Sequence, residues 1–370
     1  MYFEIVDSDK KCLKVYHRGE FKDYDADPTM KRTWKHSLHL EDRKDIDYAV
    51  LYTANGDLSK NCPGFVEESW ESSRERIAAI AESVRTAGCD TINNCIYDFV
   101  PDNFFRDFLS NKMAIVRHVF ETKEKPKHYD ILRKAHILTQ EMNGRANIYN
   151  GKLSKTNYNI FGTKTGRLSN AKAGIPILTL KKEDRHLLQP TNDFFVELDF
   201  NAAELRTLLA LSDNEQPKED IHEWTAKQAN SDRESIKKRT FAWLYNPEAS
   251  DSLLERLYER NGVKDRYYDN KAVKTPFLRE IETDERRALN YIVQSTSSDV
   301  CIEQAYKVRN FFKNCKTKVC YFMHDSVIID CDKSDKEMVL EAKKIFGNTR
   351  FGEYRVNISV GKNFGEMRKI

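Results

Sequence analysis

The sequence carries no surplus of either charge, no long apolar segment and no paired-cysteine motif. Its 61 Lys and Arg residues nearly balance 58 Asp and Glu residues and leave a formal net charge of +3. Overall charge therefore does not indicate nucleic-acid binding, and any basic surface must be local. No apolar run approaches the roughly 18 residues of a membrane span, and the first residues do not resemble a signal peptide. The eight cysteines form no CxxC pair and no Cys/His group at zinc spacing. We therefore expect reduced thiols in a cytoplasmic protein without a disulfide framework or a membrane partner.

The chain has 370 residues, enough for two or three domains, and we predict a first domain over residues 1–120. Short strands are predicted over Tyr2–Val6, Cys12–His17 and Tyr48–Tyr52, and helices over Ser72–Thr86 and Phe104–Phe120. No D-x-E on a strand is followed by further spaced acids, as a two-metal 3′–5′ exonuclease would require. We expect an accessory α/β domain with a structural or partner-binding role and no proofreading site.

A polar and basic segment over residues 121–135 predicts the domain boundary. A short helix, predicted over Tyr129–Met142, leads from it into the second domain. We expect that domain to cover residues 121–370.

The most informative stretch of the second domain is Phe194–Leu211. An apolar run, which predicts a buried strand, carries Asp199 near its end, and apolar residues at helical spacing follow at once. Glu204 lies five residues later, in the first turns of that helix. A carboxylate at such a strand-to-helix exit can stay hydrated or bind a metal. A surface aspartate that caps an amphipathic helix would give the same pattern.

A regular row of side chains follows the segment that contains His222. Arg233, Lys237, Phe241 and Tyr245 are each four residues apart, so on a helix they form one gently winding stripe. The stripe runs from cations to aromatic rings, an order that suits a nucleoside triphosphate. The alternative is a basic surface helix with two aromatic residues in the core.

Two further segments carry polar groups in defined local settings. In residues 163–169 Gly166 permits a tight turn, and Arg167 follows it. Asn290 and Gln294 are four residues apart on a predicted helix, so both amides can reach one groove of a duplex. Taken alone, each of these side chains could simply be solvated.

The segment Lys318–Asp330 predicts a hairpin of two apolar strands, with Asp325 in its tight turn. Two carboxylates on adjacent strand ends can hold two divalent metals about 3.5–4 Å apart. Magnesium suits such an oxygen-only site, because it keeps waters and takes further ligands from substrate phosphates. Cations at His222, Arg233 and Lys237 would neutralise a triphosphate during the reaction.

Six segments together resemble the polymerase domain of polymerase I-type (family A) DNA polymerases. DFNAAELR is similar to the family's first catalytic motif, D-Y-S-Q-I-E-L-R, and MHDS to the V-H-D-E turn of the second. The row R-x3-K-x3-F-x3-Y resembles the fingers helix, and RRALNYIVQSTSSD resembles R-R-A-x-N-x-x-x-Q-G-T-A-A-D. TGRLS resembles the thumb-to-palm motif, and VGKNFGEM the carboxyl-terminal ending. The matches follow the family's order from about residue 150 to 370.

The resemblance implies a catalytic centre. Asp199, Asp325 and the Phe200 carbonyl would bind two Mg²⁺ ions, for which Mn²⁺ could substitute. The side chains implied to hold the triphosphate of a dNTP are His222, Arg233 and Lys237. This lysine would also protonate the leaving pyrophosphate.

The resemblance also implies contacts with the sugar and the DNA. Glu204 would exclude a ribose 2′-hydroxyl and accept a hydrogen bond from Tyr245, and Phe241 would pack on the incoming sugar and base. The residues implied to follow the primer–template minor groove are Arg167, Asn290 and Gln294. His324 would meet the primer terminus.

The chain departs from the family pattern at several positions. Ala242, Asn246 and Ser295 stand where the family has glycine, and Ser326 replaces the glutamate after the second catalytic aspartate. Ser326 removes a secondary carboxylate, which puts metal affinity or rate in doubt. The segment between the fingers helix and residue 290 is short, as is the helical sequence before residue 163. We therefore expect trimmed fingers, a reduced thumb and low processivity without a partner.

The resulting hypothesis is an α+β protein with a right-hand polymerase fold: an antiparallel palm sheet, helical fingers and a reduced thumb behind the accessory domain. It would extend a DNA primer on a template, and a replication partner could bind residues 1–120. Its compactness suits a phage or mobile element, acting in the host cytoplasm. Two alternatives remain open: a single-subunit RNA polymerase, against which Glu204 argues, and a non-catalytic subunit that binds primer–template DNA.

Overall fold

The computed structural model describes residues 2–6, 12–17, 20–23, 35–36, 49–88, 99–170 and 174–370. The chain divides into two compact units, Met1–Tyr129 and Asp130–Ile370. No helix of the described ranges combines the length and apolar character that crossing a membrane demands.

The first unit contains a small sheet with the strand order β3-β2-β1-β4. Its strands are β1 (Tyr2–Val6), β2 (Cys12–His17), β3 (Glu20–Asp23) and β4 (Lys35–His36). Helices α1 (Gly64–Thr86) and α2 (Asp102–Thr122) follow. They share an apolar core in which the rings of Trp70 and Phe108 stack with their centroids 5.3 Å apart. The two first predicted strands and both predicted helices are confirmed.

The predicted strand over Tyr48–Tyr52 is wrong. Ala49–Tyr52 forms a single 3₁₀ turn, and Tyr48 lies outside the described residues. Ala49 and Leu51 are buried, whereas Val50 and Tyr52 are half-buried. This alternation imitates a strand, but the segment is held by side-chain packing, with the Tyr52 ring 5.1 Å from that of Phe120.

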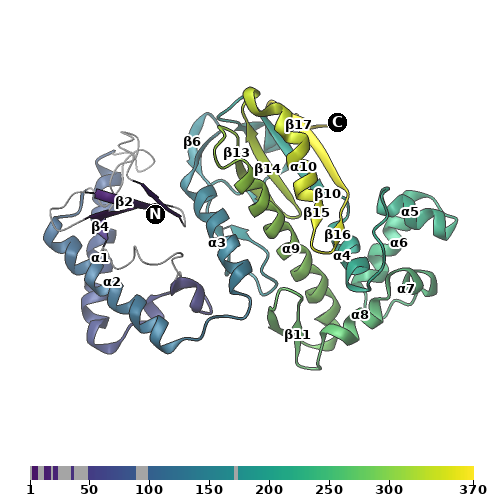
Figure 1. Cartoon of the computed structure of the whole chain (residues 1–370), viewed down its shortest axis with the longest axis horizontal. Helices are drawn as coiled ribbons and strands as arrows, with labels where there is room; N and C mark the ends of the chain where they lie inside the picture. Colours follow the sequence, from purple (N-terminus) through teal and green to yellow (C-terminus); the bar gives the residue numbers. More distant parts are fainter. Residues whose placement is uncertain are drawn as a thin grey trace. The chain divides into compact units, whose positions relative to one another are not determined.

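The second unit is built on a five-stranded sheet with the order β13-β14-β10-β17-β18 (Figure 1). Neighbouring strands are antiparallel throughout. The strands are β10 (Phe194–Phe200), β13 (Lys318–Met323), β14 (Ser326–Cys331), β17 (Val356–Gly361) and β18 (Arg368–Lys369). Helices α9 (Glu285–Phe311) and α10 (Val339–Gly347) pack on this sheet. The predicted hairpin over Lys318–Asp330 is confirmed.

The central strand β10 presents two different faces. Val196, Leu198 and Phe200 are buried, and the Phe200 ring stacks on that of Phe346 from α10 at 4.3 Å. Successive side chains of a strand point to opposite faces, so Glu197 and Asp199 lie on the face that α10 does not cover. The half-buried setting of both acids fits this assignment.

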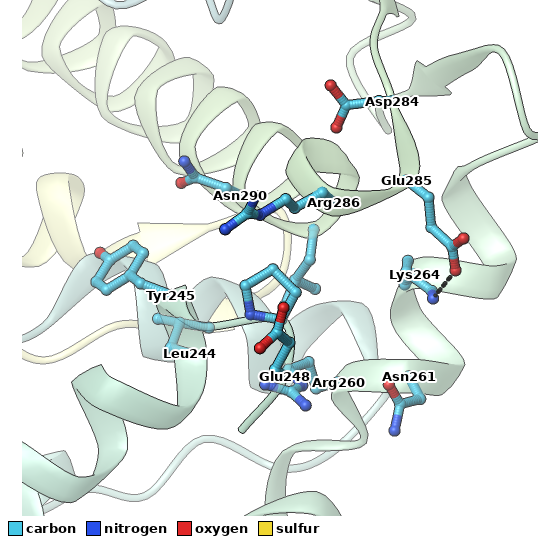
Figure 2. A pocket seen from close by; sticks show the side chains of 12 residues that line it. Leu244, Tyr245, Glu248, Arg260, Asn261, Lys264, Asp284, Glu285, Arg286 and Asn290 are labelled. Atoms are coloured by element: carbon cyan, nitrogen blue, oxygen red, sulfur yellow. Dashed lines mark hydrogen bonds and ion pairs between the residues drawn. The ribbon is translucent and has the colours of Figure 1, made fainter. Parts of the chain in front are cut away.

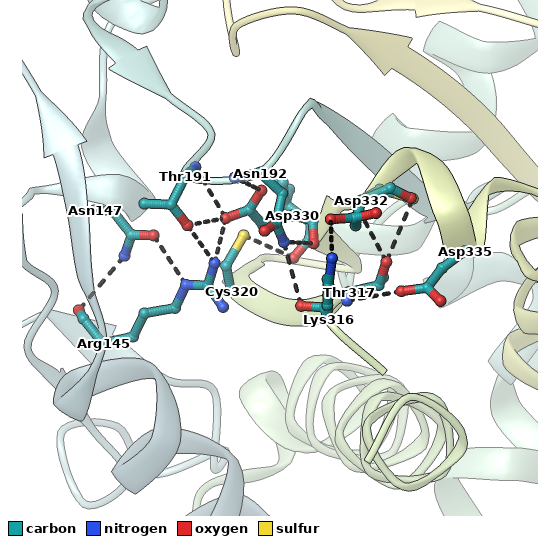
Figure 3. Close-up of polar contacts among 12 residues, drawn as sticks. Arg145, Asn147, Thr191, Asn192, Lys316, Thr317, Cys320, Asp330, Asp332 and Asp335 are labelled. Atoms are coloured by element: carbon teal, nitrogen blue, oxygen red, sulfur yellow. Dashed lines mark hydrogen bonds and ion pairs between the residues drawn. The ribbon is translucent and has the colours of Figure 1, made fainter. Parts of the chain in front are cut away.

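At the opposite end of β10 a buried acid holds the strand to its neighbour (Figure 3). The Asp330 carboxylate accepts hydrogen bonds from the backbone N–H groups of Thr191 at 3.0 Å and Asn192 at 2.9 Å, and forms an ion pair with Arg145. Arg145 also donates to the Asn147 side chain at 3.3 Å. Because Asp330 has cationic and amide partners, we interpret this cluster as structural.

Between β10 and α9 lies a helical subdomain, seen beside the sheet in Figure 1. It contains α4 (Ala203–Leu211), α5 (Ile221–Ala229), α6 (Arg233–Tyr245), α7 (Ser252–Tyr258) and α8 (Arg260–Tyr267). Its apolar core includes Trp243, Leu254 and Tyr258, all buried. The hairpin of β11 (Ala272–Lys274) and β12 (Glu280–Glu282) connects it to α9.

The remaining elements precede β10 or close the chain. Helix α3 (Tyr129–Gly144) is joined to α9 by ion pairs of Lys134 with Glu303, at 2.8 Å, and of Arg309 with Glu141. The short strands are β5 (Ala146–Tyr149), β6 (Lys152–Lys155), β7 (Tyr158–Asn159), β8 (Ser169–Asn170), β9 (Leu188–Gln189), β15 (Asn348–Thr349) and β16 (Gly352–Glu353).

Candidate active site

Two aspartates emerge from adjacent strand ends of the central sheet. Asp199 pairs with Ser326 in the β10–β14 register, and Asp325 immediately precedes Ser326 in the β13–β14 turn. The Phe200 N–H donates to the Asp325 carbonyl at 3.3 Å. His324 adopts a φ of 53°, in the left-handed region, to make this tight turn. The turn and the pairing register thus bring the two acids together.

Both aspartates are poor sites for negative charge in the absence of a cation. Burial raises the pKa of Asp199 to about 6, against a hydrogen bond from Asn357 at 3.2 Å that lowers it. Burial likewise raises the pKa of Asp325 to about 6, although Arg167 lowers it. The Oδ1 atom of Asp325 is buried and has no hydrogen-bond partner. A divalent cation would supply the missing charge.

The donor set fits magnesium bound jointly with a substrate. Within the described ranges, no three His, Cys, Asp or Glu side chains converge closely enough to hold an ion alone. Magnesium is commonly bound by one or two carboxylates and completed by substrate phosphates and water. Asp199, Asp325 and the carbonyl oxygen of Phe200 could supply protein ligands of this kind.

Glu204 connects three segments beside the acids. Ala202 takes a left-handed φ of 50° at the amino end of α4 and turns the chain away from β10. The Glu204 carboxylate, which is 9% exposed, forms an ion pair with Arg167 and accepts a hydrogen bond from the Tyr245 hydroxyl at the end of α6. Burial and the Glu204 charge raise the pKa of Tyr245, so its hydroxyl stays protonated and can donate.

The turn that carries Arg167 is packed against a second buried ion pair. Gly166 has a φ of +78°, and a Cβ atom there would lie 2.4 Å from the Arg279 guanidinium. Arg279 in turn makes two hydrogen bonds to the buried carboxylate of Asp299, at 2.7 and 2.9 Å. Glycine is therefore required by both conformation and space.

Helix α6 presents the predicted cationic and aromatic row. The Phe241 and Tyr245 rings lie parallel, with an interplanar angle of 2° and centroids 5.9 Å apart. The His222 ring on α5 is 5.7 Å from that of Phe241. Lys237 is half-buried and has no hydrogen bond or ion pair with any described residue. Its ammonium group is thus available to an anionic ligand.

Arg233 is held by Asp220, which sequence reasoning did not assign to the site. Asp220 caps α5 by accepting from the His222 N–H at 3.0 Å, and it forms an ion pair with Arg233 at 3.0 Å. Burial alone would raise the pKa of Asp220, but its bonds to Arg233 and Asn201 outweigh that effect and hold the pKa well below the usual range. Burial lowers the pKa of His222, and the charges of Arg233 and Lys237 lower it further.

A buried arginine joins this pair to the end of β10. Arg206 on α4 is fully buried and donates to both oxygens of Asn201 and to the Pro217 and Glu219 carbonyls, at 2.8–3.0 Å. Asn201 directly follows β10 and donates to Asp220 at 2.8 Å. Although burial lowers the pKa of Arg206 to about 10, the side chain is charged at neutral pH. Only the folded backbone reveals this network, because its partners are mostly carbonyl groups.

Two of the predicted groove-binding residues lie on the first turns of α9. Asn290 and Gln294 lie on successive turns of α9, and the buried Oδ1 of Asn290 has no hydrogen-bond partner. Asn290, Tyr245 and Arg286 line a cavity of about 480 Å³ between α6, α8 and the start of α9 (Figure 2). Burial lowers the pKa of His324, and the nearby charges of Arg167 and Arg185 lower it further. Sequence reasoning missed Arg185 because no recognised motif contains it.

An antiparallel sheet with two acids on adjacent strand ends, beside a helical subdomain with a cationic and aromatic helix, is the architecture of a right-hand polymerase. Comparisons with known proteins agree with this class. No family model matches the chain. The DNA polymerase I of Borreliella burgdorferi is 23% identical over 267 residues, covering 55% of this chain and 29% of that protein. The chain thus spans less than a third of the length of this relative.

A solved structure gives the same result for the fold. The POL domain of Pol1 from M. smegmatis, in complex with DNA primer-template and dNTP, superposes with a TM-score of 0.51 at 14% sequence identity. The match covers 86% of this chain and 70% of that chain. The resemblance to polymerase I-type DNA polymerases and the predicted α+β fold are confirmed. The domain boundaries and the roles of individual site residues stay predictions.

Replacing either aspartate by asparagine should stabilise the metal-free protein and abolish its response to magnesium. The native pKa values of about 6 lie above the ordinary value of 3.8, so stability is lost as the pH rises through 6. At pH 7.5, Asp199→Asn or Asp325→Asn should raise the melting temperature by about 2–4 °C, and the gain should vanish below pH 4.

Thermal unfolding with and without about 10 mM Mg²⁺, an excess of ligand that stabilises the folded state by mass action, measures both effects. Magnesium should stabilise the wild type and not these variants. Asp265→Asn, an exposed acid on α8, is the matched control and should behave as the wild type. Equal magnesium stabilisation of Asp199→Asn and wild type would contradict the metal assignment.

Proposed function

We propose that the chain adds deoxynucleotides from dNTPs to the 3′ end of a DNA primer on a template. The observation that carries this proposal is the convergence of Asp199 and Asp325 beside the cationic and aromatic face of α6. In a right-hand polymerase fold that convergence is suited to nucleotidyl transfer. The names of the similar proteins, a DNA polymerase I and a Pol1 domain in complex with primer-template and dNTP, support the same reaction.

The proposed cofactor is a pair of Mg²⁺ ions, with Mn²⁺ as a substitute. Asp199, Asp325 and the Phe200 carbonyl would hold them. Bound there, such ions activate an attacking hydroxyl and neutralise charge on a leaving pyrophosphate. The raised pKa values of both acids and the orphaned Oδ1 of Asp325 support a centre that is completed by cations.

The triphosphate would lie along the first turns of α6. Arg233 and Lys237 supply positive charge, and His222, whose lowered pKa keeps the ring neutral, can donate a single hydrogen bond. The Nδ1 atom of His222 is buried without a partner. Lys237, with no partner among the described residues, is placed to give a proton from Nζ to the leaving pyrophosphate.

Glu204 and Phe241 would select the sugar of the incoming nucleotide. Glu204 is held by Arg167 and Tyr245. Moving its carboxylate to admit a ribose 2′-hydroxyl would therefore break both interactions. The Phe241 ring, parallel to that of Tyr245, offers an apolar face and no hydroxyl. This arrangement favours deoxyribonucleotides and is the observation that disfavours the RNA polymerase alternative.

Primer–template DNA would lie across the open face of the sheet. Arg167, Asn290 and Gln294 would follow its minor groove, and His324 would meet the primer terminus near Arg185. A processivity or replication partner would bind through residues 1–120, which we expect to lack proofreading activity. Primer extension with dNTPs or with rNTPs separates the proposal from an RNA polymerase and from a non-catalytic binding subunit.

Extension should depend on both aspartates. Asp199→Asn or Asp325→Asn should abolish magnesium-dependent extension and leave primer–template binding largely intact, because the DNA contacts lie elsewhere. Steady-state extension and a gel-shift assay measure the two properties. Activity within about tenfold of wild type, a barrier change of only about 1.4 kcal/mol, would remove both acids from catalysis.

Sugar selection should follow Glu204 and Phe241. Glu204→Ala should raise rNTP use relative to dNTP use, because it empties the space beneath the 2′ position. Phe241→Tyr should relax discrimination against dideoxynucleotides by about a hundredfold, since the new hydroxyl can replace a missing 3′-hydroxyl. Competition of each analogue with dNTP on one primer measures both ratios. Unchanged ratios in both variants would show that α6 does not face the nucleotide.

Asp220 should act on nucleotide binding through Arg233. Asp220→Asn keeps a good helix cap but removes the charge that orients the guanidinium. We expect the KM for dNTP to rise about tenfold, a loss of about 1.4 kcal/mol of binding, with a smaller change in kcat. Asp232→Asn is the control, because Asp232 caps α6 without an ion pair to Arg233. A fall in kcat at constant KM would contradict this role.

A further inference from the structure

Glu197 lies on the same face of β10 as Asp199, two residues earlier in the strand. In the β10–β14 register Asp199 is opposite Ser326 and Glu197 is opposite Ile328, so Glu197 and Ser326 are diagonal neighbours. The Ser326 hydroxyl lies 3.1 Å from the Glu197 carboxylate and 3.1 Å from the Met323 carbonyl, so its single proton can be donated to either. The side chain at 326 and a carboxylate from the adjacent strand therefore share one location.

That location is where the chain departs from the family pattern. Ser326 stands in the position of the glutamate that follows the second catalytic aspartate in V-H-D-E. Ser326 has no carboxylate of its own, but its hydroxyl can donate to the carboxylate of Glu197 on β10. The acid missing from the turn is thus present at the same place on the sheet, contributed by a different strand.

The acids of this face have no cation in direct contact. The charges of Lys369 and Arg167 act on Asp199 and Asp325 only from beyond ion-pair distance. Asp199, Asp325 and Glu197 form no ion pair with any described Lys, Arg or His side chain. Glu197 is half-buried, and Ser326 is its one side-chain hydrogen-bond partner among the described residues. The Asp325 Oδ1 atom, buried without a partner, independently points to a ligand here. Carboxylates left this way are costly unless a cation joins them.

We propose that Glu197 is the third carboxylate of the metal centre and replaces the family's glutamate from the neighbouring strand. This inference rests on the proposed function. Because no three such side chains converge within direct reach of one ion in the described structure, Glu197 is a positioning residue. It would accept hydrogen bonds from water bound to a divalent cation held by Asp199 and Asp325, and the Ser326 hydroxyl would orient it when donating to Glu197.

Removing the carboxylate at position 197 and then restoring one at position 326 tests the proposal. Glu197→Gln and Glu197→Ala should each weaken Mn²⁺ binding to the full chain by about tenfold, as loss of an outer-shell partner does. The concentration of Mg²⁺ for half-maximal extension should rise to the same degree, with the KM for dNTP unchanged. Adding Ser326→Glu to Glu197→Ala should restore both, because it returns the carboxylate to the turn. Glu366→Gln, an exposed acid after β17, is the matched control.

Mn²⁺ binding followed by electron paramagnetic resonance needs no activity, so it separates this inference from the proposed function. Loss of affinity in the Glu197 variants and recovery in the double variant support the relocation. Wild-type Mn²⁺ affinity in Glu197→Gln overturns it. Failure of the double variant to recover affinity, while its melting temperature matches that of wild type, overturns it as well. If wild type binds Mn²⁺ through Glu197 but extends no primer, the proposed function fails and the metal site stands.

Discussion

The antiparallel pairing of β10 with β14 is the constraint on which the candidate site depends. Its register sets Asp199 opposite Ser326 and therefore beside Asp325. A slip of one residue would turn Asp199 toward α10 and bring a core residue to the open face. The buried Asp330 cluster at the far end of the strands resists such a slip, since its amide and guanidinium partners match only one alignment. The bonds of Asp330 at one end of the sheet thus help to fix the register that places Asp199 beside Asp325 at the other.

The end of the same strand is also hydrogen-bonded to the helical subdomain. Asn201, directly after β10, bonds to Arg206 and Asp220, and Asp220 holds Arg233. A displacement of α6 toward a bound nucleotide would have to break or carry along this chain of charged hydrogen bonds. Charge-assisted bonds contribute about 1.5–3 kcal/mol each when buried, and less at Arg233, whose side chain is 38% exposed. Under the proposed function, this chain of bonds would couple the position of the triphosphate to that of the metal.

The sequence predicted those strands, helices and hairpins that have a visible apolar period or a tight turn. The strand that ends near Asp199, the helix of Arg233 and the hairpin around Asp325 each have a period or a turn that is visible in the chain. The 3₁₀ turn at Ala49–Tyr52 was mistaken for a strand because a short apolar run does not distinguish the two. Asp220 and Arg206 were not assigned, since their partners are backbone groups and side chains that only the tertiary fold brings near. Local signals name candidate groups, but long-range hydrogen bonds decide which of them are held in place.

The position of Glu197 shows how a motif can change without a change in the charge of its site. Antiparallel strands place diagonal neighbours within reach of long side chains, so one location on a sheet can be filled from either strand. A motif search compares positions along one strand and therefore counts Ser326 as a loss. In the folded sheet, residues on adjacent strands are also neighbours. Measured that way, the face around Asp199 and Asp325 keeps three carboxylates and no ion-paired cation among the described residues. Under the proposed assignment, the number of carboxylates around the two aspartates is kept although one comes from a different strand. A cation would respond to their distances in space and not to their order in the sequence.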